Sequence, residues 1–155
     1  MTPKSLLRHK LAVSALAELS SGGCQSVIPD SEADVKKVKR IVLCSGKVYY
    51  DLLEQVRAEK QDNTALIRIE QLYPFPTSEL TAQLTRYPKV KDIVWCQEEP
   101  KNQGAWYCTQ HHLLSCVAKS QTVHYVGRPA SAAPAVGSPL VHAQEQQMLV
   151  KEALN

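Results

Sequence analysis

The fold is decided by the stretch RIVLCSGK at residues 40–47, where a short apolar run ends at Ser45-Gly46 and a helical pattern begins. The run at 40–45 has the length and apolar content of a buried strand. Residues 47–61 then place Val48, Leu52 and Val56 on one stripe, with charged residues on the other faces. The stretch therefore predicts a strand, a tight turn and an amphipathic helix.

The same alternation repeats along the rest of the chain. Further strands are predicted at 64–69, 92–97 and 122–126, and further helices at 77–86, 106–118 and 139–154. The hydroxyl of Thr77 or Ser78 is expected to cap the helix at 77–86. A short helix at 13–19, ended by Gly22-Gly23, and a polar connection at 30–39 precede the pattern. The alternation predicts an α/β fold with a mostly parallel sheet covered on both faces, in which ligands and partners meet the carboxyl ends of the strands.

Composition restricts the class of protein. The chain has 155 residues, 44% of them hydrophobic and 21% charged, with a formal net charge of +3, which is typical of one soluble domain and gives no reason to expect a nucleic-acid partner. No apolar stretch reaches the ~18 residues of a membrane span, and no secretory signal is evident, so we expect a cytosolic or organelle-matrix protein without a membrane partner. The five cysteines lack a CxxC pair and are expected to be reduced thiols.

Two loops at predicted strand ends carry groups that could do chemistry. Ser45-Gly46-Lys47 could receive an anion at a helix start, although it lacks the GxxxxGK[ST] and GxGxxG patterns, and the alternative is a glycine required by a tight turn. Glu98-Glu99 could form an acid/base pair, but consecutive side chains of an extended chain point in opposite directions. We therefore favour pairing of these carboxylates with basic groups or helix amides at an interface.

Three further patterns have simpler structural explanations. Cys108, His112 and Cys116 share one helical face, but their outer members are ~12 Å apart along the helix, so a packed stripe is favoured over a metal site. No GxSxG elbow supports a hydrolase, which is kept as an alternative together with a small reductase. The loop at 127–137 is rich in small residues and proline and is expected to lie against another surface and to present Arg128.

Six ordered motifs resemble a known family. The resemblance lies in TPKSLLR at 2–8, CSGKVYYDL at 44–52, RIEQLYP at 68–74, WCQEEP at 95–100, NQGAW at 102–106 and GRPAS at 127–131. Together they closely resemble the carboxyl-terminal domain of the thiamine-diphosphate-dependent decarboxylating component of the 2-oxoglutarate dehydrogenase complex. The resemblance implies the transketolase C-terminal fold, a three-layer αβα sandwich around a mostly parallel five-stranded sheet.

The resemblance also implies a function. The parent enzyme decarboxylates 2-oxoglutarate on thiamine diphosphate and Mg²⁺ in the tricarboxylic acid cycle, with the cofactor held between two earlier domains at a dimer interface. We expect this chain to hold no cofactor and to be inactive alone. Its expected partners are the thiamine-binding domains, a homodimer partner and, through the complex, dihydrolipoyl succinyltransferase. The expected location is the bacterial cytoplasm or the mitochondrial matrix.

The amino end of the chain is expected to belong to a linker. In the family the TPKS motif follows the preceding domain, so Met1 is expected to correspond to an internal residue. Residues 1–10 are then a linker remnant, of which 1–7 are expected to be mobile, and residues 11–155 form the transketolase C-terminal-like domain.

Two sets of residues are predicted to carry function. The first set is expected to form a dimer or interdomain contact and comprises Glu98, Glu99, Asn102, Gln103 and Trp106. A second set, the basis of an alternative in which the domain is regulatory, is expected to converge on one loop edge and bind an anionic effector such as a nucleotide or acyl-CoA; it comprises Lys47, Tyr50, Gln103 and Arg128. Around Trp106 we expect an exposed apolar patch.

Overall fold

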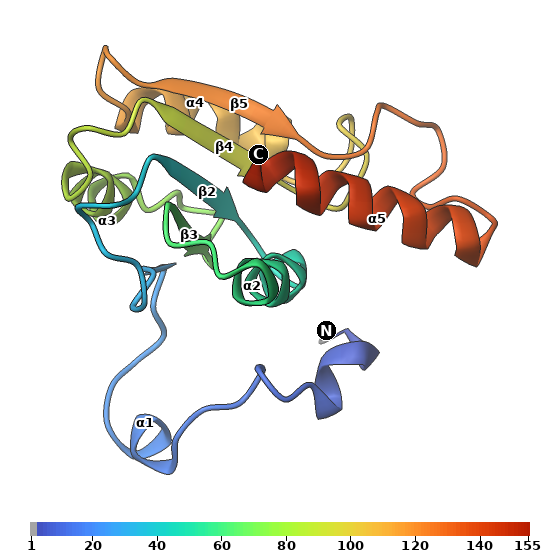
Figure 1. The fold of residues 1–155 in the computed structure, drawn as a ribbon, viewed down its shortest axis with the longest axis horizontal. Helices are drawn as coiled ribbons and strands as arrows, with labels where there is room; N and C mark the ends of the chain where they lie inside the picture. The colour runs from blue at the N-terminus through green and yellow to red at the C-terminus, as the bar shows by residue number, and fades with distance from the viewer. Residues whose placement is uncertain (1–2) are drawn as a thin grey trace.

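A computed structural model describes residues 3–155, without the side chain of residue 19. The strands are β1 (Val27–Ile28), β2 (Arg40–Cys44), β3 (Thr64–Ile69), β4 (Asp92–Cys96) and β5 (Thr122–Val126). The helices are the 3₁₀ helix η1 (Lys4–Arg8), α1 (Leu16–Ser20), α2 (Val48–Glu59), α3 (Thr77–Thr85), α4 (Trp106–Cys116) and α5 (Pro139–Leu154). The five strands form one sheet in the order β1-β3-β2-β4-β5, in which only the β1–β3 pair is antiparallel (Figure 1).

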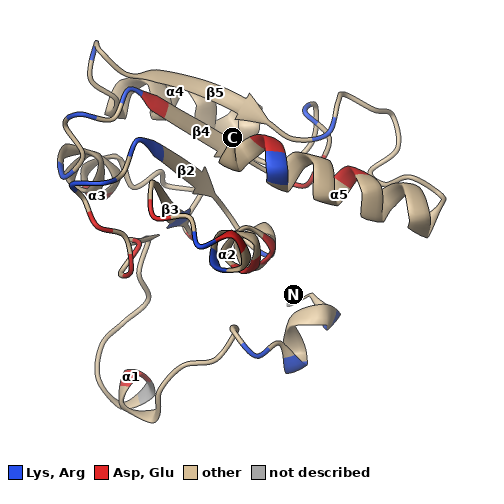
Figure 2. Cartoon of the chain, in the orientation of Figure 1, with Lys and Arg blue, Asp and Glu red and all other residues tan. Residues whose placement is uncertain are grey.

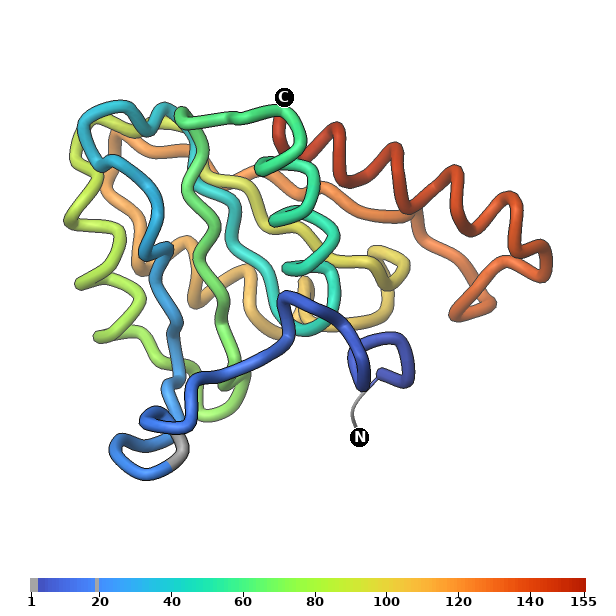
Figure 3. The backbone as a smooth tube through the Cα atoms, turned by 60° about the horizontal axis from the view of Figure 1, so that its bottom comes forward, coloured from blue at the N-terminus to red at the C-terminus, as the bar shows by residue number. Residues whose placement is uncertain are grey.

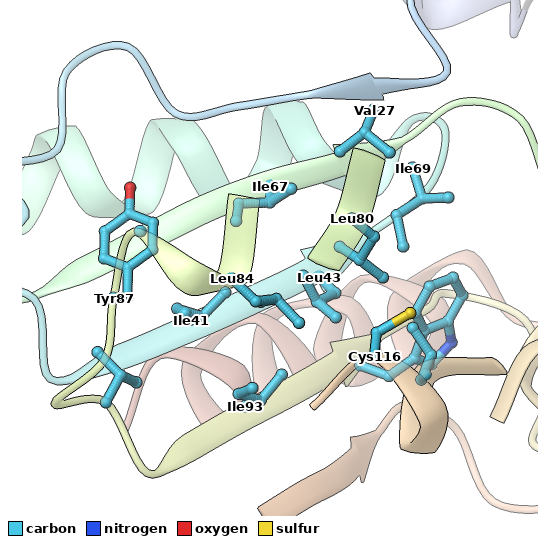
Figure 4. Packing of buried hydrophobic residues seen from close by; sticks show 14 of the residues in the cluster. Val27, Ile41, Leu43, Ile67, Ile69, Leu80, Leu84, Tyr87, Ile93 and Cys116 are labelled. Carbon is cyan, nitrogen blue, oxygen red and sulfur yellow. The ribbon is translucent and has the colours of Figure 1, made fainter. Parts of the chain in front are cut away.

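Helices cover both faces of this sheet, because alternate strand residues point to opposite sides. On β2, Ile41 and Leu43 pack into a core with α3 and α4, as Figure 4 shows for the side chains of this cluster. Val42 and Cys44 of the same strand pack into a second core with α2 and α5. The predicted three-layer sandwich around a mostly parallel five-stranded sheet is therefore confirmed.

The central strands bring distant loops together. β2 and β4 run parallel in register from Arg40 opposite Asp92 to Cys44 opposite Cys96, so both strands end at the same level. The loop at 45–47 therefore begins beside the loop at 98–104. This shared carboxyl edge positions the site described below.

One strand was not predicted from the sequence, and one local prediction was wrong. The edge strand β1 has only two residues and pairs antiparallel with Ile69 and Arg68, which the polar surroundings of Val27–Ile28 did not indicate. The expected hydroxyl cap of α3 is absent, because the helix starts one residue earlier in the chain than that cap requires: the N-cap is Pro76, and its side chain makes no cap hydrogen bond.

The amino-terminal segment follows an extended path outside the sandwich (Figures 1 and 3). It touches α2 through His9, whose Nε2 lies 3.3 Å from Oε1 of Glu54 and whose ring lies 5.3 Å from that of Tyr50. Of the segment 1–7 that we expect to be mobile, residues 1 and 2 lie outside the described residues. None of the helices within residues 3–155 is long and apolar enough to cross a membrane.

Candidate functional site: an ion-pair network at the carboxyl edge of the sheet

Lys47 lies at the turn between β2 and α2 and is held by two carboxylates. Its Nζ is 2.8 Å from Oε2 of Glu98 and 3.1 Å from Oδ2 of Asp51, one helical turn further on. Burial alone would lower the pKa of Lys47, but the hydrogen bonds and charges of Glu98 and Asp51 outweigh burial and raise the pKa above its ordinary value. The ammonium is therefore charged and already paired.

Arg128 follows β5 and is the second cation of the network. Its side chain donates from Nε to Oε2 of Glu145 at 2.8 Å, from one terminal nitrogen to Oε1 of Gln146 at 2.9 Å, and from the other to the carbonyl of Glu98. Gln146 in turn donates to Oδ2 of Asp51 at 2.7 Å. One continuous network thus ties α2, the loop after β4, the loop after β5 and the middle of α5.

Gln97, the residue directly after β4, organises the adjoining loop 98–104. Its Oε1 accepts from Nε1 of Trp95 at 3.1 Å and from the amide of Trp106 at 3.0 Å, while its Nε2 donates to three carbonyls of the loop. The chain passes so close that a Cβ at Gly104, whose φ is +67°, would lie 3.0 Å from Nε2 of Gln97. This buried amide therefore fixes the loop that carries most of the predicted contact residues.

Asn102 and Gln103 of the predicted contact set bind another loop of the same chain. Asn102 Nδ2 and Gln103 Nε2 both donate to the carbonyl of Ser131, at 2.9 and 3.0 Å, and the amide of Ser131 donates back to Asn102 Oδ1 at 2.9 Å. These two side chains therefore hold the loop after β5 in place. Asn102 is exposed and Gln103 is half-buried, so both still border the surface.

The other predicted contact residues have different surroundings. Glu98 is half-buried in the network, whereas Glu99 is exposed, so the two neighbouring carboxylates do have separate environments. Trp106 is half-buried and packs on Tyr125, with ring centroids 5.2 Å apart. Burial raises the pKa of Tyr125 to about 12, which keeps its hydroxyl protonated as the donor to the carbonyl of Arg128 at 3.1 Å. A role of this set in contacts with a partner stays a prediction.

The four residues predicted to bind an effector follow strand ends at the carboxyl edge of the sheet, but their side chains have separate partners, and effector binding by them stays a prediction. Lys47 and Arg128 belong to the network above, Gln103 binds the carbonyl of Ser131, and the ring of Tyr50 lies 5.6 Å from the guanidinium carbon of Arg68. The expected presentation of Arg128 by its loop was wrong, since its residue surface is only 8% exposed. The carboxylate of Glu145, the amide oxygen of Gln146 and the carbonyl of Glu98 hold this side chain inward.

The cysteine and histidine stripe of α4 is divided between surface and core. Cys108 is exposed, Cys116 is buried, and the ring of His112 stacks on Phe75 at 5.0 Å with an interplanar angle of 9°. Throughout residues 3–155, no three His, Cys, Asp or Glu side chains gather in a way that could hold a metal ion.

Sequence reasoning missed four residues of the site. Asp51 could have been found, because it lies four residues after Lys47 on a predicted helix. Gln97, Glu145 and Gln146 carried no such signal, since their partners are distant in sequence or are backbone groups.

Fold and site together define an αβα domain whose polar groups at the strand ends are bound to one another. The family model described as 2-oxoglutarate dehydrogenase C-terminal matches residues 13–154. The 2-oxoglutarate dehydrogenase E1 component of Haemophilus influenzae is 57% identical over the whole chain, and that of Coxiella burnetii is 55% identical over 99% of it. That of a Geobacillus species is 45% identical over 99% of the chain. The chain belongs to the 2-oxoglutarate dehydrogenase C-terminal family.

The matched region is a small part of these relatives. The chain spans 17% of the Haemophilus and Coxiella proteins and 16% of the Geobacillus protein.

Proposed function

We propose that this chain is the carboxyl-terminal domain of a 2-oxoglutarate dehydrogenase E1 component and serves that enzyme by contact, not by catalysis. The parent enzyme would decarboxylate 2-oxoglutarate oxidatively in the tricarboxylic acid cycle. The observation that carries the proposal is the 57% identity to such a component over the full chain. The internally paired network supports the non-catalytic part, because a catalytic group has to be free to meet a substrate.

The residues of this chain do not fit the cofactors of the proposed parent enzyme. Thiamine diphosphate carries a negatively charged diphosphate, and the two cations at the strand ends, Lys47 and Arg128, are already paired with carboxylates. Mg²⁺ requires several oxygen ligands at one point, and the described part of the chain offers no such acidic cluster. Cofactor binding would therefore fall to other parts of the enzyme.

The proposed partners follow from the same reasoning. They are the thiamine-binding domains, a second copy in a dimer and, through the complex, dihydrolipoyl succinyltransferase. Within this chain the contact set is Glu98, Glu99 and Trp106 at the surface, with Asn102 and Gln103 acting as well through the loop that they hold. For a bacterial enzyme the proposed location is the cytoplasm.

The test is a chimera in which this chain replaces the corresponding carboxyl-terminal sixth of the Haemophilus relative. We expect the chimera to release CO₂ from 2-oxoglutarate, and the relative truncated before that region to be inactive. The isolated chain should release none and should show no heat on calorimetric titration with thiamine diphosphate and Mg²⁺. Turnover or cofactor binding by the isolated chain, or a folded chimera no more active than the truncated relative, would overturn the proposal.

A further inference from the structure

The segment 129–148, which we name the neutral arm, is almost without charge. It comprises most of the loop after β5 and the amino-terminal part of α5, and its only charged residue is Glu145. Charged residues make up 21% of the whole chain, so a stretch of this length would be expected to contain about four of them. Figure 2 shows this part of the molecule almost entirely tan, whereas charges are spread over α2 and the loops before it. The depletion is therefore local to the arm.

The neutral arm is also exposed. Among its residues only Val136, Glu145 and Gln146 are half-buried, and the others are exposed. Its large apolar side chains reach into solvent, with Leu140 69% and Met148 62% exposed. Figures 1 and 3 show the amino-terminal half of α5 projecting beyond the sheet. Exposed surface with apolar side chains and without charge is typical of the core of a protein interface.

Contacts at both ends of the segment give the neutral arm a defined position. Asn102 and Gln103 bind Ser131 near its start, as described above. Arg128 binds Glu145 and Gln146 on α5, and the last turns of the helix are buried in the core. A surface fixed in this way is ordered before a partner arrives, which lowers the entropic cost of association.

We infer that the neutral arm is the docking surface for the preceding part of a 2-oxoglutarate dehydrogenase polypeptide; the inference rests on the proposed function. The identity of the occupant follows from the length of the relatives and from the polarity of the neutral arm. The Haemophilus relative has 83% of its chain outside the matched region, and the family description places that region at the carboxyl end. A surface without charge offers no opposite charge to a strongly acidic or basic partner and fits an apolar, uncharged one.

The inference is tested by hydrogen–deuterium exchange of peptides from 129–148, in the isolated chain and in the active chimera. We expect about tenfold slower exchange in the chimera, because docking protects amides that are open in the isolated chain. Leu140→Glu in the chimera should restore the faster exchange. The matched control is Leu114→Glu on α4, an exposed leucine of another helix, which should leave the exchange of the neutral arm unchanged.

Each outcome decides between the two proposals. If the chimera turns over 2-oxoglutarate while 129–148 exchange as in the isolated chain, the docking inference fails and the proposed function stands. If the chimera is folded but inactive, the proposed function fails. Protection of 129–148 that grows with the concentration of the isolated chain would assign the surface to a second copy and overturn the inference. Circular dichroism of both variants checks that they remain folded.

Discussion

Removal of the Gln97 side-chain amide should lower the free energy of unfolding by more than the loss of a single hydrogen bond would, because this amide has several partners. Gln97→Leu keeps the volume and leaves Nε1 of Trp95, a fully buried residue, without its acceptor. An unpaired buried donor costs about 1–3 kcal/mol. The amide of Trp106 loses its acceptor as well, for about 0.5–1.5 kcal/mol, and the carbonyls of loop 98–104 lose their donor but can reach water in part.

The expected total is about 3 kcal/mol of unfolding free energy, or about 6–12 °C in Tm for a domain of this size. Urea denaturation followed by circular dichroism measures it. Gln83→Leu is the matched control, because the Gln83 side chain on α3 has, among the described residues, a hydrogen bond only from the exposed Arg86. The control should change stability by less than about 0.5 kcal/mol.

A double-mutant cycle tests the cause. Trp95→Phe removes the buried N–H, so Gln97→Leu made in that background should cost about 1–2 kcal/mol less than in the parent chain. If the two costs are equal, or if Gln97→Leu alone stays within 0.5 kcal/mol of the parent, then Gln97 does not hold this loop and the reasoning fails.

Other changes test the rest of the network and the core. Gly127→Ala would bring a Cβ to 2.7 Å from the backbone oxygen of Gln97 and should cost about 1–3 kcal/mol in urea denaturation, whereas Gly137→Ala, with open space around it, should be neutral. Burial raises the pKa of Cys96 from 9.0 to about 12, so between these values the unfolded thiol loses its proton first and stability should fall as pH rises; Cys96→Val should reduce that fall in urea midpoints. Iodoacetamide at pH 8 should label only the exposed thiols, which are those of Cys24 and Cys108. Mass spectrometry reads the labelling, and equal labelling of all five cysteines would contradict the buried core. Arg128→Ala should speed hydrogen exchange of 129–148 in the isolated chain while β2 stays protected, and unchanged exchange would show that Arg128 does not anchor the arm.

The sequence predicted the main strands and helices because their signals are local. Apolar runs and helical stripes reflect which face of each element is buried, and α5 begins and ends where its pattern does. β1 was not predicted because two residues are too few to show an alternating pattern of apolar and polar side chains. Only their pairing with Ile69 and Arg68 makes them a strand. The expected cap of α3 failed for a related reason, since a hydroxyl near a helix start does not by itself reveal which residue the helix begins at.

The site was predictable only where its partners are near in sequence. Lys47 and Asp51 are four residues apart on one helix and could be paired from spacing alone. Arg128 was expected to be presented at the surface, but its side chain turns inward to bind Glu145 and Gln146 on the next helix. A short motif around Arg128 does not include these partners, so it could not predict the burial. The role of Gln97 could not be predicted from the sequence, because its partners are mostly backbone groups.

The inward position of the arm's one charge and the burial of Arg128 have one geometric origin. His142, Glu145 and Gln146 lie three and four residues apart, so they share the face of α5 that meets the guanidinium. The arm's one charge therefore points inward, and the outward faces, including Leu140, keep neutral side chains. Because a helical stretch of about ten residues is marginal in water without tertiary contacts, this inward face also keeps the outer half of α5 helical. Loss of the Arg128 contacts would therefore weaken docking without altering any residue of the docking surface.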